Sequence, residues 1–376
     1  MALIDLTAAE AHLVAPRGGD GGTGNSDLLV EPRYFDRDQV ITHVASAIAA
    51  LAFTWLVYER LTVFSGDLGF LVVWWVSFTG FVYVTSRQQW GSVVATNNLV
   101  RVVVTSAAAL ALIPLAAILL AVIVRGWRGM QISFLTTTMR TASTESKFSQ
   151  GGAWHAIVGT LEVVGLAALM SVPLGIMTAV FLNEVGGRLA MPVRMLTDAM
   201  SAIPSIVAGL FIFAVLIQSH YLDQTGFSGA LALSILMLPT VTRTAEVVLR
   251  LVPGGLREAS LALGSTEWRT TKNVVLPTAR TGLVTAVVLG VARIIGETAP
   301  LIVTMLGSQL FNANPFANKQ DALPIYIWTQ KLTSTGDNTV TANWMWAGAF
   351  VLMVLVLILF VTARILGNRT VGVRRG

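Results

Sequence analysis

An arginine and a glutamate occur together inside one of the most apolar stretches of this chain. Arg293 and Glu297 belong to the run ARIIGET, within a segment that predicts one membrane-spanning helix over residues 278–306. An ionised side chain at the centre of a spanning helix costs about 2.5–3.5 kcal/mol on insertion scales. Residues at i and i+4 share a helix face, so these two side chains could pair with each other. We therefore interpret both residues as functional candidates.

Arg243 is a second intramembrane candidate, four residues after Pro239 in an expected helix over residues 227–249. It could contact a transported ligand. Alternatively, it could anchor its helix end in an interfacial ion network, because Glu246 at i+3 and Arg250 at i+7 share its helix face. Three further acidic residues close to expected helix ends are interpreted as caps or structural partners: Glu162, Glu184 and Asp198.

The composition of the whole chain is that of a polytopic membrane protein. Charged residues make up 12% of the 376 residues and hydrophobic residues 54%, whereas charged residues make up about 25% of an ordinary soluble domain. Cysteine is absent, which excludes disulfides, thiolate metal sites and cysteine nucleophiles. The four histidines are scattered, so the sequence indicates no metal site. The N-terminal residues lack a basic start followed by an apolar core, and they therefore predict a disordered tail and not a signal peptide.

Apolar stretches of roughly 20 residues, the length that crosses about 30 Å of hydrocarbon, predict eight membrane-spanning helices. They are expected near residues 40–58, 68–86, 100–124, 155–182, 195–218, 227–249, 278–306 and 343–366. An even number of crossings places both termini on one side of the membrane. Lys and Arg are more frequent in the loops on that side, so the positive-inside rule predicts cytoplasmic termini. The same rule places residues 87–99 and 254–277 in the cytoplasm and residues 308–342 outside.

The cytoplasmic residues 254–277 are too organised to be a simple connection between two helices. Apolar positions alternate with charged ones at helical spacing, Gly264 interrupts the pattern, and Pro277 is expected to open the next span. The pattern predicts two short amphipathic helices along the membrane surface. Such helices could anchor the chain at the lipid interface, or they could form a docking surface for a cytosolic partner.

The residues of this segment resemble the EAA signature of bacterial ATP-binding-cassette importer permeases. Glu258-Ala259-Ser260 is followed by Gly264 and, after nine intervening residues, by Val274-Val275-Leu276-Pro277. Ser260 and Val274 are the departures from the signature. In that family the segment forms a coupling helix that inserts into a cleft on the ATPase subunit. The resemblance therefore favours docking. It implies coupling roles for Arg257, Glu258, Ala259, Ser260, Gly264, Leu276 and Pro277.

Further motifs resemble the PstA-type subunits of phosphate-specific importers, over roughly residues 100–366. They are PLGIMTAVFLNEV (173–185), IPSIVAGLF (203–211), LPTVTRTAEVVLRLVP (238–253) and ARIIGETAPL (292–301). Sister PstC-type subunits carry a different run after the GE pair, so Thr298-Ala299-Pro300 favours the PstA type. The resemblance implies an all-α, type I importer permease fold with a six-helix core. Two additional N-terminal transmembrane helices precede the core, and the resemblance does not cover them.

The implied ligand, inorganic phosphate, is an anion that needs positive charge and hydrogen-bond donors along a low-dielectric route. The guanidinium fork of Arg293 suits phosphate oxygens, and Glu297 would balance its charge when no phosphate is present. We expect the substrate pathway to include Arg293, Glu297, Arg243 and Thr298.

The expected organisation has four parts, the third of which contains the coupling segment. It comprises a disordered cytoplasmic tail (residues 1–38), a two-helix membrane extension (39–99), the permease transmembrane domain (100–366) with its coupling segment (254–277), and a basic cytoplasmic tail (367–376).

No nucleotide-binding signature occurs in the sequence, so the energy must come from another chain. The resemblance implies a non-catalytic permease of the bacterial cytoplasmic (inner) membrane that itself binds no cofactor and no nucleic acid. Its expected partners are a PstC-like permease, a PstB-like ATPase dimer that holds ATP and Mg²⁺, a PstS-like phosphate-binding protein, and membrane lipid.

Three alternatives stay open from the residues alone. A permease for another oxyanion, such as molybdate or sulfate, is the first. A secondary anion transporter would also place Arg and Glu in the membrane, although it would not need a docking segment. A membrane-embedded enzyme could use Glu297 as an acid or base, but the sequence shows no second catalytic group that converges with it.

Overall fold

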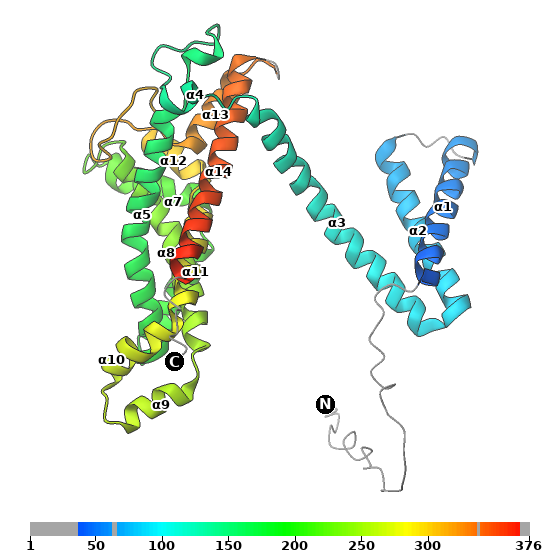
Figure 1. Cartoon of the computed structure of the whole chain (residues 1–376), viewed down its shortest axis with the longest axis horizontal. Coiled ribbons are helices and arrows are strands. Elements are labelled where there is room, and N and C mark those ends of the chain that lie inside the picture. The colour runs from blue at the N-terminus through cyan, green and yellow to red at the C-terminus, as the bar shows by residue number, and fades with distance from the viewer. Residues whose placement is uncertain (1–36, 62–65, 337–338, 369–376) are drawn as a thin grey trace, which may run out of the picture. The chain divides into compact units, whose positions relative to one another are not determined.

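The computed structural model describes residues 37–61, 66–336 and 339–368, and all regular structure in them is helical (Figure 1). The α-helices are α1 (Arg37–Leu56), α2 (Asp67–Trp90), α3 (Ser92–Trp127), α4 (Ile132–Thr136), α5 (Trp154–Val180), α6 (Ala190–Ser201), α7 (Ser205–Ile212), α8 (Gly226–Arg250), α9 (Gly254–Ala262), α10 (Glu267–Thr270), α11 (Leu276–Ile294), α12 (Ala299–Met305), α13 (Leu323–Thr333) and α14 (Val340–Asn368). The predicted all-α class is confirmed. The predicted tails over residues 1–38 and 367–376 lie almost entirely outside the described residues.

Seven helices of the described chain are long and apolar enough to cross a membrane. A bent pair, α6 with α7 and the π-helical turn Phe213–Ile217, makes an eighth span if the pair is counted as one. The eight crossings predicted from the sequence correspond to these seven helices plus the bent pair.

The chain packs as two compact units, divided inside α3. In the N-terminal unit, hydroxyl and amide side chains lie between the helices. The hydroxyls of Ser46 in α1 and Thr85 in α2 are 3.4 Å apart, and the Nδ2 of Asn98 in α3 donates to Ser86 Oγ at 3.1 Å. Ser86 and Asn98 are fully buried. Because an unpaired polar group is costly in an apolar medium, such pairs hold neighbouring helices in one arrangement.

The helix α3 is longer than the sequence predicts. It begins at Ser92, ahead of the expected range 100–124, and only Gly91, with a φ of 85°, separates it from α2. At 1.5 Å per residue it is about 54 Å long, which exceeds the hydrocarbon thickness of about 30 Å. The predicted domain boundary between residues 99 and 100 therefore falls inside a continuous helix.

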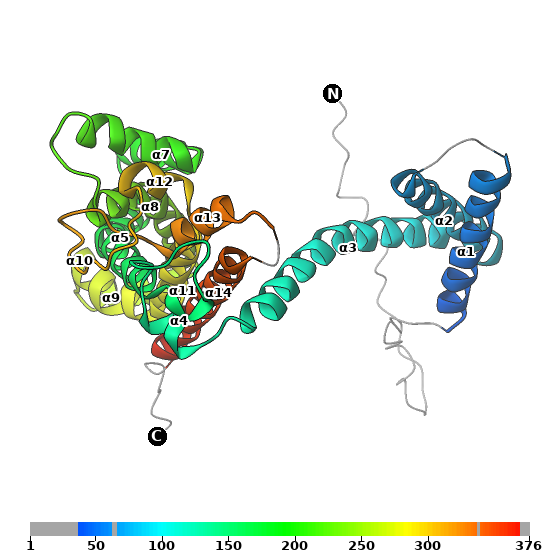
Figure 2. The same ribbon diagram turned by 90° about the horizontal axis from the view of Figure 1, so that it is seen from above.

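In the C-terminal unit, α5, α8, α11 and α14 lie side by side and enclose the main apolar core (Figures 1 and 2). Small residues permit their close packing. A Cβ added at Gly175 of α5 would lie 2.9 Å from Cγ1 of Val241 in α8, and one added at Gly290 of α11 would lie 2.6 Å from Cγ2 of the same valine. Glycines at such contacts allow helix backbones to approach, as in other membrane bundles. The core includes Val163, Leu233, Met237, Ile294 and Leu301.

The single helix predicted over residues 195–218 is wrong. The chain forms α6, bends by 103°, and continues as α7. The bend occurs at Ile203 and Pro204, where Pro204 has an extended ψ of 138° and precedes the first residue of α7. Proline has no N–H to donate and disfavours helical geometry in the residue before it, so it ends α6.

The single helix predicted over residues 278–306 is also wrong. The helix α11 ends at Ile294, and α12 begins only at Ala299. Gly296 lies in the break, where a residue without a side chain weakens the helix. Pro300 is the second residue of α12, a position in the first helical turn where proline is tolerated. The break falls inside the ARIIGET run and changes the geometry of the site predicted there.

The segment between α8 and α11 forms two short helices, α9 and α10, as the sequence predicts. Gly264 between them has a φ of 83°, a conformation that glycine adopts without strain. Thr266 caps α10 by accepting a hydrogen bond from the backbone N–H of Arg269. A π-helical turn, Thr271–Val275, then leads into α11, whose second residue is Pro277.

The helix α13 was not expected, because residues 308–342 are interpreted from the sequence as one loop. It packs against α14 and α5, and its residues Leu323 and Tyr326 are fully buried. An apolar stretch of this length is too short to predict a spanning helix, so hydropathy gives no signal for it.

Candidate functional site

Arg293 occupies the last turn of α11, directly before the break between α11 and α12. Its side chain is exposed, and it has no ion pair or side-chain hydrogen bond with any residue that the structure describes. A cation at the C-terminal end of a helix is stabilised by the helix dipole. The guanidinium therefore keeps its donors available for an anion.

Glu297 and Thr298 lie in the break itself and are partly buried. The backbone N–H of Glu297 donates to the carbonyl oxygen of Ile294 at 3.1 Å, which closes a final turn after α11. The Arg293–Glu297 ion pair expected from i,i+4 spacing is absent from the described ion pairs, because the helix ends between the two residues. Membership of Arg293, Glu297 and Thr298 in a substrate pathway stays a prediction.

The break is held in place by α7, which lies beside α12 (Figure 2). Gly209 of α7 faces Pro300, and a Cβ at Gly209 would lie 2.6 Å from the Cα and 2.9 Å from the carbonyl oxygen of Pro300. Because both neighbours are backbone atoms, they cannot rotate away. The bent segment α6 to α7 and the broken segment α11 to α12 are therefore packed against each other.

Arg243 belongs to an ion network centred on Glu246, near the C-terminal end of α8. The Glu246 carboxylate accepts hydrogen bonds from Arg194 of α6 at 2.7 Å, from Arg243 at 3.0 Å and from Arg250 at 2.5 Å. Asp198 of α6 also pairs with Arg243. This network matches the alternative role predicted for Arg243 from the spacing of Glu246 and Arg250 in the sequence, and it confirms that part of the network. The sequence does not predict that Arg194 belongs to the network, because only the packing of α6 on α8 brings that side chain to Glu246.

The expected coupling residues fall into two groups. Glu258 and Ala259 are exposed on α9, beside the exposed side chains of Leu256, Leu261, Leu263 and Trp268. This face has no partner within the described chain, as a docking surface requires. Pro277 and Leu276 start α11, and Gly264 makes the turn between α9 and α10.

Arg257 and Ser260, by contrast, point back into the protein. Arg257 forms a two-bond ion pair with Glu184, at 3.1 Å from Nε to Oε2 and 2.8 Å from Nη2 to Oε1. The hydroxyl of Ser260 lies 2.9 Å from that of Thr270 in α10. These two side chains hold α9 in place and leave the exposed face of α9 for contacts with another chain.

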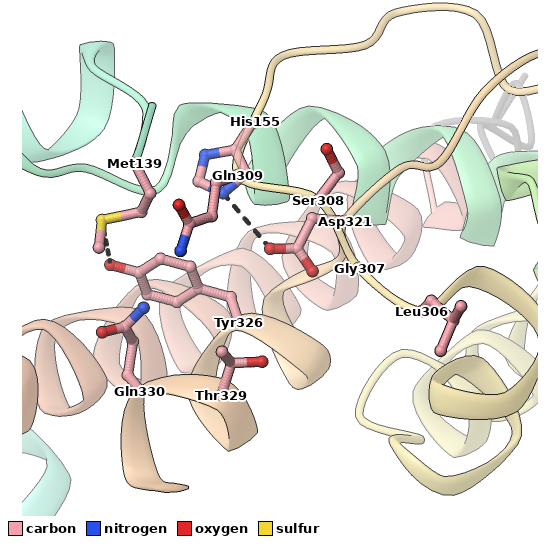
Figure 3. A pocket seen from close by; sticks show the side chains of 10 residues that line it. All are labelled: Met139, His155, Leu306, Gly307, Ser308, Gln309, Asp321, Tyr326, Thr329 and Gln330. Atoms are coloured by element: carbon pink, nitrogen blue, oxygen red, sulfur yellow. Dashed lines mark hydrogen bonds and ion pairs between the residues drawn. The ribbon is translucent and has the colours of Figure 1, made fainter. Parts of the chain in front are cut away.

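A cavity of about 170 Å³ lies at the other end of the C-terminal unit, and no pattern in the sequence predicts it (Figure 3). It contains the buried pair His155 and Asp321, with Nε2 and Oδ2 3.3 Å apart, beside the buried Tyr326. Burial raises the pKa of Asp321, and His155 lowers that pKa in part. Burial, and then the charge of Asp321, raise the pKa of Tyr326. The pair joins the start of α5 to the loop before α13.

A family model described as "Binding-protein-dependent transport system inner membrane component" matches residues 171–372. The chain is 40% identical over 266 residues to "Phosphate transport system permease protein PstA 1" of Mycobacterium tuberculosis (strain CDC 1551 / Oshkosh), covering 70% of this chain and 86% of that protein. It is 36% identical over 241 residues to "Phosphate transport system permease protein PstA" of Haemophilus influenzae, covering 62% and 82%.

Among solved structures, an inward-facing form of the MetNI methionine ABC transporter matches with a TM-score of 0.43 and 22% identity, covering 58% of this chain and 92% of that chain. The family model spans more than half of the chain, and the relatives match over most of their own length. The chain therefore belongs to the family of binding-protein-dependent transport system inner membrane components, multi-pass proteins of the membrane.

Proposed function

We propose that this chain is a permease subunit of an ATP-driven importer of inorganic phosphate. The observation that carries the proposal is Arg293 at the break between α11 and α12, which has no ion-pair partner among the described residues, in a chain whose relatives are named phosphate transport permeases. Arginine suits this task because its planar fork donates two parallel hydrogen bonds to one oxyanion.

In this proposal the subunit supplies half of the pathway and none of the energy. A second, related permease completes the pathway, an ATPase dimer binds ATP and Mg²⁺, and an extracytoplasmic protein delivers phosphate. The exposed face of α9 around Glu258 and Ala259 is the surface offered to the ATPase. Lys and Arg are more frequent on the side of the membrane that carries α9 and both termini, so the positive-inside rule places all three in the cytoplasm.

ATP binding would draw the two coupling helices of the permease pair together and change which side of the membrane the pathway faces. The packing of α7 on the break between α11 and α12 supports this mechanism, because movement of either bent segment displaces the other. Rigid-body movement of packed helices is a common form of such switching.

The test is uptake of labelled phosphate by proteoliposomes that contain the complete complex, with sulfate and molybdate as competitors. We expect uptake to require ATP and to resist both competitors. Arg293→Gln should abolish it, and Arg293→Lys should impair it because lysine keeps the charge but loses the fork. Arg280→Gln, at the other end of α11 and also exposed, is the matched control and should transport at the wild-type rate.

Three outcomes would contradict the proposal. Uptake without ATP would indicate a secondary carrier. Full competition by sulfate or molybdate would indicate a permease for that oxyanion. Wild-type phosphate uptake by Arg293→Gln would place the pathway elsewhere. Because Arg293 and Glu297 are not paired, we expect Glu297→Gln not to restore transport to Arg293→Gln.

A further inference from the structure

Glu184 lies far from α9 in the sequence but touches it in space. It is in the π-helical turn Phe181–Val185, which continues α5. Its two carboxylate oxygens accept hydrogen bonds from Nε and Nη2 of Arg257, in α9. The Glu184 and Arg257 side chains are 10% and 23% exposed. Asn183 donates a further hydrogen bond to Glu184 Oε1 at 2.6 Å.

The same guanidinium also binds the end of α8. Arg257 Nη2 donates to the carbonyl oxygen of Leu249 at 3.0 Å, and Nη1 donates to that of Val252 at 2.8 Å. Carbonyl oxygens in the last turn of a helix have no partner within the helix, so basic side chains often satisfy them. Arg257 thus uses four of the five N–H donors of an arginine, and one side chain joins α5, α8 and α9.

This junction differs from an ordinary surface ion pair. Exposed pairs contribute little, because water competes for both charges. Here the pair is bidentate and mostly buried, and two main-chain acceptors fix the orientation of the guanidinium. A lysine could not reproduce the arrangement, because its ammonium is a single point of charge without a planar fork.

The far end of α9 is held as well. The Ser260 hydroxyl contacts that of Thr270, and α10 continues through a π-helical turn into α11. A displacement of α9 therefore reaches α5 and α8 through Arg257, and α11 through Ser260. The helix α8 carries Arg243 and Glu246, and α11 carries Arg293.

We propose that Glu184 is a positioning residue for coupling: through Arg257 it makes the ends of α5 and α8 move together with α9 when the ATPase displaces α9. The transport part of this inference rests on the proposed function. The mechanical part, that loss of the Glu184 carboxylate loosens all three segments together, does not depend on it.

The experiment compares Glu184→Gln, Arg257→Lys and the control Glu145→Gln, an exposed acid without a described partner, in the assembled complex. Hydrogen–deuterium exchange is measured for residues 181–185, 249–252 and 254–262, with α14 as internal reference. In the two junction variants we expect exchange in all three segments to rise about tenfold, as for loss of one partner of a partly buried pair. Exchange in α14 should not change.

The second measurement is the ratio of phosphate transported to ATP hydrolysed. We expect both junction variants to keep hydrolysing ATP while this ratio falls, and the control to keep the wild-type ratio. A residue that served stability alone would lower both activities together.

The proposal is overturned if exchange in α9 stays at the wild-type rate in Glu184→Gln, or if exchange rises while the ratio is unchanged. Absence of ATP-driven phosphate uptake in the wild-type complex would overturn the proposed function. In that case the exchange measurement still decides whether Glu184 and Arg257 join the three segments.

Discussion

Replacement of Glu246 by glutamine is expected to destabilise the C-terminal unit. The Glu246 side chain is 3% exposed, and it is the acceptor shared by Arg194, Arg243 and Arg250. Glutamine has nearly the same volume but no charge. Three guanidinium groups would then lie close together, with Asp198, which pairs with Arg243, as the remaining acid of the network.

The size of the expected loss in the free energy of unfolding follows from the burial of Glu246 and its arginine partners. Loss of one partner of a buried ion pair costs about 3–5 kcal/mol, whereas an exposed pair contributes about 0–1 kcal/mol. The side chains of the three arginines are 38%, 32% and 56% exposed, so water screens part of their repulsion. We therefore expect Glu246→Gln to lower the free energy of unfolding by about 2–3 kcal/mol. In a unit of this size about 1 kcal/mol lowers the melting temperature by about 2–4 °C, so the fall should be about 4–12 °C.

The assay is thermal unfolding of the purified protein in detergent, followed by tryptophan fluorescence. Arg250→Gln is the matched control, because it removes the most exposed of the three arginines and should cost less than about 1 kcal/mol. The double variant Glu246→Gln with Arg194→Gln should recover part of the loss, since it removes one of the repelling cations. If Glu246→Gln unfolds at the wild-type temperature, the network does not stabilise the contact between α6 and α8 and the reasoning is refuted.

Three further predictions test other parts of the structure. Burial raises the pKa of Asp321, so its contribution to stability is present below the ordinary aspartate pKa and is lost as the pH rises through the raised value. The melting temperature should therefore fall over that range of pH, and Asp321→Asn should flatten this dependence. Gly209→Ala should destabilise the packing of α7 on α12 by about 1–3 kcal/mol, whereas Gly165→Ala, whose Cβ would meet no atom within 4 Å, should not lower the melting temperature. The native chain lacks cysteine, so an impermeant thiol reagent should label Ser334→Cys but not Thr266→Cys in intact cells, and the reverse pattern would invert the topology.

The all-α class, the approximate position of most spans, and the two short helices between α8 and α11 could be predicted from the amino-acid sequence. Hydropathy and helical periodicity are local properties, and stretches of roughly 20 apolar residues have few alternatives in a membrane. The turn at Gly264 and the exposed positions of Glu258 and Ala259 could also be predicted, because they depend on neighbouring residues only.

Helix breaks were only partly visible in the sequence. Pro204, Gly296 and Pro300 are readable as residues that disturb a helix, yet proline and glycine also occur inside continuous helices here: α5 contains Pro173 and α8 contains Pro239. Which of them ends a helix depends on whether neighbouring helices satisfy the freed backbone groups. For this reason the Arg293–Glu297 pair, which assumes an unbroken helix, was wrongly predicted.

Which charged side chains meet depends on the packing of the folded chain and could not be predicted from the sequence. Arg194 reaches Glu246, and Arg257 reaches Glu184, across 52 and 73 residues of sequence. Periodicity assigns each residue to a face of its own helix but does not say which helix lies opposite that face. That choice is made by the packing of α6 and of the π-helical turn Phe181–Val185 on α8, which brings these charges within hydrogen-bonding distance.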